Sequence, residues 1–164
     1  MKNNIPNFAS LFRQAPKAVA RVKGSDEYPE IGGNVWFYQF NYGVLVVADI
    51  MGLPTSNFFC KNPIYAFHIH EGDSCMGNEE DPFADAKMHY NPENCSHPYH
   101  AGDLPPLFSA NGFAFLAVLV NRFTIDEVIG RTVIIHSSVD DFVTQPSGNA
   151  GTKIACGKIV AFSW

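Results

Sequence analysis

The sequence lacks any apolar run that approaches the roughly 20 residues a helix needs to span a bilayer. Residues 1–16 are polar with scattered apolar side chains, and they contain neither the apolar segment nor the small-residue cleavage site of a secretory signal. We therefore expect no membrane contact and a cytoplasmic location for the chain as given. An exported form is expected only if a signal segment has been removed.

Charged residues are also scarce, at 16% of the chain against roughly a quarter in typical proteins. The net charge is −5, and no Lys/Arg cluster interleaved with aromatic residues occurs, so nucleic acid is an unfavourable partner. Aromatic residues make up 13% of the chain, which excludes a disordered protein. A length of 164 residues suits one domain that buries most of its apolar surface.

Short apolar or alternating runs separated by glycine-rich and proline-rich turns predict an all-β sandwich or barrel. The expected strands cover residues 18–23, 34–40, 43–50, 64–70, 112–119, 131–136 and 154–162, with one helical turn at 124–129. Two long loops are expected at 72–112 and 137–152. Ordering such loops is entropically costly, so each needs something that fixes it in place.

Five of the six histidines lie between residues 66 and 103. His68 and His70 belong to an apolar run of β-forming residues, where side chains two residues apart project from the same face. His136 ends a second apolar run. A single histidine in a soluble domain is more often a surface residue or a hydrogen-bonded core residue than a ligand, but this combination favours metal binding.

The spacing predicts two adjacent metal sites that share one ligand. His97, His100 and Asp103 offer two nitrogens and one oxygen, and a fourth ligand would complete the tetrahedral shell that zinc prefers. His89 is the candidate for that position. His68, His70, His89 and His136 would instead give Cu(II) the four nitrogen ligands that suit it.

Five motifs resemble those of the copper/zinc superoxide dismutase family, in the family's order. They are FHIHEGD at 67–73, HYNP at 89–92, HAGDL at 100–104, GRTVIIH at 130–136 and GNAGTKIACG at 148–157. The resemblance runs from about residue 18 to the C-terminus. It implies an eight-stranded Greek-key β-barrel with long metal-binding and electrostatic loops, formed by residues 18–164, with residues 1–17 as an N-terminal extension.

The resemblance also implies a disulfide between Cys75 and Cys156, which match the family's pair by position in both motifs. Cys60 and Cys95 are not assigned by it. A second bridge and two free thiols both stay open, because four cysteines allow three pairings.

The activity implied by the resemblance is conversion of superoxide to dioxygen and hydrogen peroxide by a copper ion beside a structural zinc ion. His89 would bridge the two metals and carry a proton. Lys153 stands where the family has an active-site arginine, so it keeps the positive charge for an anionic substrate but loses the planar fork. Asp140 matches the aspartate that joins a copper histidine, here His68, to a zinc histidine, here His97. Arg131 resembles a strand arginine that anchors the disulfide loop.

The chain departs from the family in two further respects: the loop between His89 and His100 is shorter than usual, and few charges precede Gly148. Two other functions are considered, a non-enzymatic metal-binding or copper-delivery protein and a structural zinc domain with no copper. The complete copper ligand set argues against both. Besides superoxide, a second copy of the chain and a copper chaperone are the expected partners.

Overall fold

The computed structural model describes residues 14–56 and 63–163. Within them the chain forms eight strands, one helical turn and one 3-10 turn. In chain order these are β1 Ala18–Gly24, β2 Gly32–Phe40, β3 Gly43–Met51, β4 Ile64–His70, η1 Ala84–Ala86, β5 Asp103–Phe108, β6 Ala114–Val120, α2 Ile125–Val128, β7 Thr132–His136 and β8 Lys153–Ala161. The proposed extension at 1–17 lies mostly outside the described residues.

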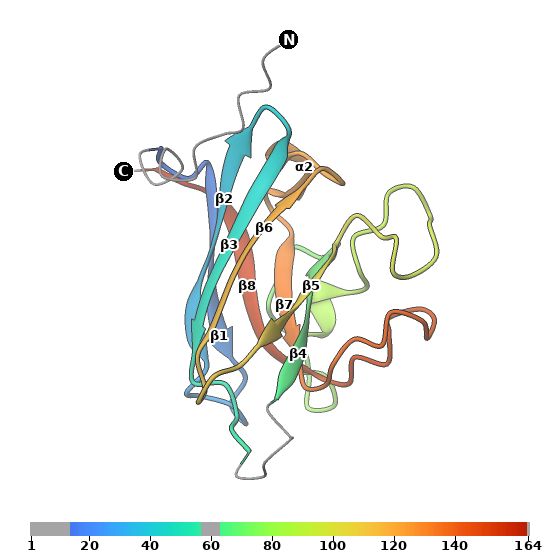
Figure 1. Ribbon diagram of the computed structural model, residues 1–164. Coiled ribbons are helices and arrows are strands. Elements are labelled where there is room, and N and C mark those ends of the chain that lie inside the picture. The colour runs from blue at the N-terminus through green and yellow to red at the C-terminus, as the bar shows by residue number, and fades with distance from the viewer. Residues whose placement is uncertain (1–13, 57–62, 164) are drawn as a thin grey trace.

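The strands form one antiparallel sheet in the order β5-β4-β7-β8-β1-β2-β3-β6. Figure 1 shows this sheet curling round on itself, with the long loops on one side of it. The two edge strands, β5 and β6, follow each other in the sequence and are joined by a turn held by an Ala110–Phe113 bridge. The expected all-β barrel is confirmed, and it is nearly closed.

Strand β4 is buried on both of its faces. Phe67 and Ile69 point into the barrel core, where they pack with side chains from the other strands. His68 and His70 alternate with them and therefore lie on the outer face, although both are at most 2% exposed. The loops that follow β4 and β7 cover that outer face. The barrel thus supplies a rigid wall, and the two loops enclose polar side chains against it.

Strand β5 corrects the prediction that residues 72–112 form an uninterrupted loop. Its Pro105 and Pro106 have no N–H to donate to a ladder, which argues against a strand in the sequence. They are tolerated because β5 is an edge strand that pairs only with β4, and because the register shifts between Tyr65 and Phe67. Ala66, at that shift, donates its N–H to the carbonyl of Ser138 in the other loop, at 2.8 Å.

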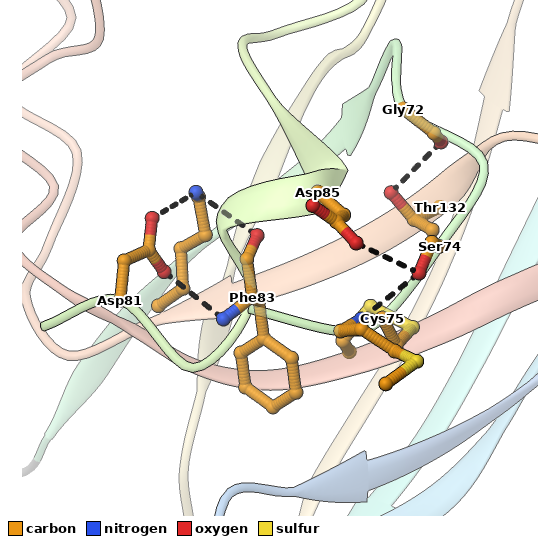
Figure 2. Close-up of a disulfide and its surroundings, with 10 residues drawn as sticks. Gly72, Ser74, Cys75, Asp81, Phe83, Asp85 and Thr132 are labelled. Atoms are coloured by element: carbon orange, nitrogen blue, oxygen red, sulfur yellow. Dashed lines mark hydrogen bonds and ion pairs between the residues drawn. A yellow bond between two sulfur atoms is a disulfide. The ribbon is translucent and has the colours of Figure 1, made fainter. Parts of the chain in front are cut away.

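The loop after β4 is fixed by the expected disulfide between Cys75 and Cys156 (Figure 2). This bond ties the loop to β8 across 81 residues of sequence. The hydroxyl of Thr132 on β7 adds a hydrogen bond to the carbonyl of Gly72, at 3.3 Å. Cys95 is an exposed free cysteine, and Cys60 lies outside the described residues.

No helix in residues 14–56 and 63–163 is long and apolar enough to cross a membrane.

Replacing Cys75 and Cys156 together by alanine is expected to lower the free energy of unfolding of the metal-free protein by about 4 kcal/mol. The reason is that the open chain regains the entropy of a loop of this length. Denaturant unfolding followed by far-ultraviolet circular dichroism measures the effect. Cys95→Ala is the matched control and should stay within about 0.5 kcal/mol. A loss of less than 1 kcal/mol in the double variant would contradict the stabilising role.

Candidate metal centre

Two groups of side chains meet on the outer face of β4, and each offers four ligand atoms that lie within 4.8 Å of one another. Both groups are fully buried. The first group contains His68, His70, His89 and His136, and the second contains His89, His97, His100 and Asp103. These are the two sets predicted from the sequence, and His89 belongs to both.

The barrel positions the first group through regular backbone pairing. His68 and His70 project from β4, and His136 ends the neighbouring β7. His89 comes from the loop, but its backbone pairs with that of His70. The next residue, Tyr90, donates its N–H to the carbonyl of Ile69 at 2.8 Å, which extends this pairing along β4 next to the start of β5.

The second group is held by the return of the same loop to the barrel. Asp103 opens β5, and its carboxylate accepts the backbone N–H of His100 at 3.0 Å. Arg122, which follows β6, donates to the carbonyls of Pro98 and His100 at 3.0 and 3.2 Å. These contacts attach the second group, called the zinc-type ligands below, to the segment that follows β6, the other edge strand of the sheet.

Hydrogen bonds determine which ring nitrogen carries the proton in two histidines of the first group, called the copper-type ligands below. His70 Nδ1 lies 2.8 Å from the carbonyl of Lys87, and His136 Nδ1 lies 3.4 Å from the carbonyl of Gly151. A carbonyl can only accept, so both Nδ1 atoms must be donors and both Nε2 atoms carry lone pairs. The two Nε2 atoms nevertheless lie 3.2 Å apart. Two facing lone pairs repel each other, and a cation between them removes that repulsion.

Unpaired buried nitrogens complete the same donor set. His68 donates from Nε2 to the carboxylate of Asp140 at 2.8 Å, which leaves its buried Nδ1 without a partner. His89 Nδ1 contacts Asp103 at 2.8 Å, whereas its buried Nε2 has no partner. An unsatisfied buried nitrogen is unfavourable unless something binds it. Four imidazole nitrogens therefore fit a copper ion on one side of His89, and three nitrogens with a carboxylate fit zinc on the other.

The surroundings favour the neutral form of His68, His70 and His136 and the charged form of Asp140. Burial lowers the pKa of His68 to about 4. Burial, with the neighbouring histidines, lowers the pKa of His136 to about 3 and that of His70 well below its ordinary value. Burial alone would raise the pKa of Asp140, but the hydrogen bond from His68 and others from the loop lower it overall. Neutral imidazoles beside ionised carboxylates are the protonation states that bind cations.

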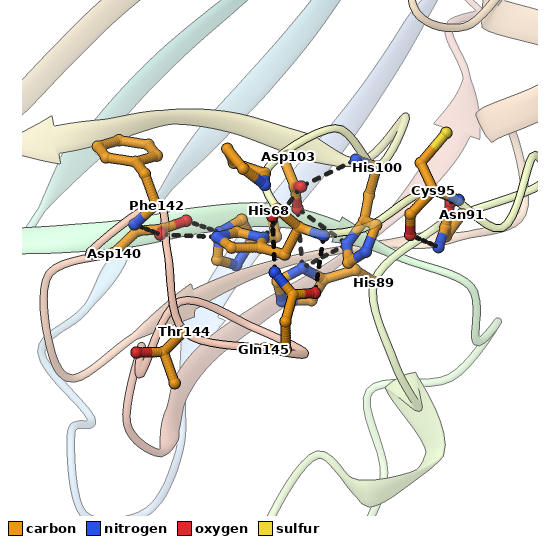
Figure 3. A network of polar contacts seen from close by, with 12 residues as sticks. His68, His89, Asn91, Cys95, His100, Asp103, Asp140, Phe142, Thr144 and Gln145 are labelled. Atoms are coloured by element: carbon orange, nitrogen blue, oxygen red, sulfur yellow. Dashed lines mark hydrogen bonds and ion pairs between the residues drawn. The ribbon is translucent and has the colours of Figure 1, made fainter.

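Asp140 lies between the two groups and accepts from both (Figure 3). One oxygen is 2.8 Å from His68 Nε2 and the other is 2.9 Å from His97 Nε2, the geometry that the role expected from the sequence requires. Gly148 makes room for this contact. It has φ +68°, and a Cβ atom there would lie 2.0 Å from the Asp140 carboxylate and 2.7 Å from His97 Nε2.

Gln145 joins the two loops and was not anticipated from the sequence. Its side-chain oxygen accepts the backbone N–H of His97 at 3.0 Å, and its amide donates to the carbonyl of His97 at 2.7 Å. Figure 3 shows this amide directed towards the histidine cluster. Nothing in the sequence distinguishes Gln145 from any loop glutamine, because its partner is the backbone of a residue 48 positions away.

A cleft of about 260 Å³ opens onto the first group. His70, His89 and His136 line it, whereas His97, His100 and Asp103 do not. Lys153 also lines the cleft, as expected of a residue that attracts an anion, but its ammonium is bound by the carboxylate of Asp81 at 2.6 Å and the carbonyl of Phe83 at 3.2 Å. Figure 2 shows Asp81 and Phe83 close together on the same loop segment.

Arg131 has the structural position expected for it. Its guanidinium donates to the carbonyl of Glu71 at 3.0 Å and lies 3.9 Å from the centre of the Tyr90 ring. It therefore supports two segments of the loop that contains the disulfide, at Glu71 and at Tyr90.

Comparison with known proteins gives a consistent result. Residues 31–159 match the family model described as copper/zinc superoxide dismutase. The chain is 37% identical to the Cu-Zn superoxide dismutase of Legionella pneumophila over 92% of this chain and 85% of that protein. It is 32% identical to superoxide dismutase (Cu-Zn) 2 of Aquifex aeolicus, over 92% and 91%. The solved Cu/Zn superoxide dismutase of Brucella abortus has the same fold, with a TM-score of 0.71 and 23% identity, over 87% of this chain and 99% of that one.

Gly148→Ala is expected to lower zinc affinity by about 10- to 100-fold, because the added methyl group displaces Asp140 from His97. Competition with a chromophoric chelator measures the affinity. Gly130→Ala is the matched control, since Gly130 also has a positive φ, of +92°, but a Cβ there meets nothing within 4 Å. Both variants should lose about 1 kcal/mol of stability or more from backbone strain. Equal zinc affinities in the two variants would contradict the proposed role of Gly148.

Proposed function

The chain belongs to the copper/zinc superoxide dismutase family, and from this we propose how its residues divide the work of converting superoxide to dioxygen and hydrogen peroxide. His68, His70, His89 and His136 hold copper, and His89, His97, His100 and Asp103 hold zinc. Copper, when bound, supplies one-electron oxidation and reduction of superoxide. Zinc has no redox chemistry and stabilises the arrangement of the loops.

The observation that carries this division is the position of the His89 ring. Its Nδ1 lies among the zinc-type ligands, 2.8 Å from Asp103, and its Nε2 belongs to the group that borders the cleft. In the described part of the chain, three of the four copper-type ligands line the cleft, whereas His97, His100 and Asp103 do not. This matches a catalytic metal site, which needs an accessible position, next to a structural site, which is closed.

The protein also has to deliver protons, because two superoxide anions consume two protons when they form one dioxygen and one hydrogen peroxide. His89 Nε2 is buried, has no hydrogen-bond partner and belongs to a ring that lines the cleft. It can therefore hold a proton beside the reacting anion and release it to the reduced product. Asp103 keeps the opposite side of the ring in place meanwhile.

His68 and His136 serve to keep the coordination geometry fixed. Their outward nitrogens are held by Asp140 and by the carbonyl of Gly151. Such contacts set both the tautomer and the orientation of a ligating ring. Lys153 contributes positive charge at the cleft, and its pairing with Asp81 also holds the wall formed by the disulfide loop.

A homodimer and a copper chaperone belong to the proposal as partners. For the homodimer, support comes from large apolar side chains exposed around the β5–β6 edge, among them Phe108, Phe113, Phe115 and Leu119, each at least 50% exposed. Apolar surface of this kind is typical of interaction sites. The chaperone and the cytoplasmic location stay predictions.

The function is tested by reconstituting the protein with both metals and measuring metal content and superoxide consumption on the same sample. One copper and one zinc per chain with rapid consumption are expected. His136→Ala should lose the activity, by at least 100-fold, while it still binds one zinc ion, because His136 belongs only to the copper-type group. Equal activity in this variant would refute its assignment to copper.

The homodimer is tested by multi-angle light scattering over a range of protein concentrations. The unchanged protein is expected at twice the 18.1 kDa chain mass. Phe115→Asp should shift it to the mass of one chain, because a carboxylate would be buried in an apolar interface. Tyr42→Asp, at a side chain that is also exposed but lies in the β2–β3 turn, is the control. A single-chain mass for the unchanged protein would exclude the homodimer.

A further inference from the structure

We propose that Gln145 is a positioning residue of the zinc-type site, because it holds the backbone of His97 in place from the other loop. This inference rests on the proposed function, which assigns zinc to the second group. It makes zinc affinity depend on the described loop 137–152, which contributes none of the four ligands of that group.

Three of the four zinc-type ligands have backbone contacts with the barrel or with the segment after β6. The backbone of His89 pairs with β4, Asp103 begins β5, and the carbonyl of His100 accepts from Arg122 at 3.2 Å. His97 differs from them. In the described part of the chain, neither its N–H nor its carbonyl bonds to another backbone group. His97 is only 3% exposed, so both groups need a partner within the protein.

Gln145 supplies both partners. Its side-chain oxygen accepts the N–H of His97 at 3.0 Å, and its amide nitrogen donates to the carbonyl of His97 at 2.7 Å. One hydrogen bond would let the His97 backbone rotate about it, whereas two bonds to the same residue fix both its position and its direction. Gln145 therefore does for His97 what strand pairing does for His89.

The ring of His97 is held by the same loop as its backbone. Its Nε2 lies 2.9 Å from the Asp140 carboxylate, which can only accept. In the neutral ring, Nδ1 then has the lone pair, and within the described residues this buried nitrogen has no hydrogen-bond partner. It lies 3.0 Å from a carboxylate oxygen of Asp103, among the other zinc-type ligands. Asp140 thus sets the rotation of the ring, and Gln145 sets the position of the backbone that bears it.

The turn that contains Gln145 is fixed by hydrogen bonds of its own. The Asp141 carboxylate accepts the backbone N–H groups of Val143 and Thr144, at 2.9 and 2.8 Å. The carbonyl of Thr144 accepts the N–H of Gly148 at 2.7 Å. None of these three bonds uses the side chain of Gln145. Replacing that side chain should therefore release His97 and leave the turn intact.

The position of His97 matters for affinity because an unsupported ligand has to be ordered when the metal binds. Contacts that orient a metal ligand typically change metal affinity by about 10- to 100-fold. Gln145 is an exposed residue, so water can replace part of its contribution, and the expected loss is near the lower limit. The coupling is reciprocal, so bound zinc should stabilise the turn around Gln145 by the same factor.

The test replaces Gln145 by methionine, which has a similar length but no amide to donate or accept. In the copper-free protein, Gln145→Met is expected to bind zinc about tenfold more weakly, measured by competition with a chromophoric chelator. The affinity of the zinc-free protein for its first Cu(II) ion should stay within about twofold, because His97 is not in the copper-type group. An equal loss for both metals would indicate general destabilisation and would overturn the positioning role.

Thr144→Val is the matched control. Thr144 precedes Gln145 in the same turn, but its hydroxyl donates to Asp141, at 2.6 Å, and not to His97. Figure 3 shows its side chain apart from the histidine cluster. Zinc affinity in this variant should stay within about twofold of that of the unchanged protein. If Gln145→Met and Thr144→Val bind zinc equally well, the proposal is wrong.

Amide hydrogen exchange of the metal-free protein gives a second readout, which needs no zinc. The N–H of His97 should exchange about tenfold faster in Gln145→Met, because its acceptor is gone. The N–H of His100, which donates to Asp103, should keep its rate. An unchanged rate at His97 would also overturn the proposal. Full metal content in the unchanged protein without superoxide consumption would instead refute the proposed function and leave the role of Gln145 intact.

Discussion

The structure depends on burying six imidazole rings and two carboxylates outside the barrel core, where water cannot solvate them. A buried polar group without a partner is unfavourable by about 1 to 3 kcal/mol. The outward nitrogens of His68, His70 and His136 are satisfied by Asp140 and by backbone carbonyls. The inward nitrogens of His68 and His89 are not. These two nitrogens therefore gain a partner only when cations are bound. In the metal-free protein both stay without a hydrogen bond.

The same constraint explains how two long loops are ordered with little secondary structure of their own. Each loop is attached to the barrel and to the other loop at a few defined points. Cys75 is bonded to β8, and Arg122 donates to backbone carbonyls of the segment that contains the zinc-type ligands. Gln145 forms hydrogen bonds with both the N–H and the carbonyl of His97. Asp140 then joins a copper-type ring to a zinc-type ring. Loss of either metal should therefore change the ligand geometry of the other site, through Asp140 as well as through His89.

Alternating apolar runs and turn residues are local signals, so the sequence was sufficient to predict an all-β sandwich or barrel, and the family resemblance added the eight-stranded barrel. Strand β5 escaped prediction because Pro105 and Pro106 normally exclude a strand, and only its edge position makes them tolerable. The two ligand sets could be predicted because histidine is rare and its spacing is informative. The roles of Gln145 and Arg122 could not be predicted, because both side chains bind backbone groups. Every residue has such groups, so the residue type of the partner gives no signal.

The net negative charge of this enzyme repels its anionic substrate, so the charges close to the copper site determine how often the two meet. This chain has Lys153 within the cysteine-containing motif of the last strand. A lysine ammonium is a compact charge that one carboxylate can neutralise, and Asp81 does so across the cleft wall. Pairing stabilises the wall but removes attraction.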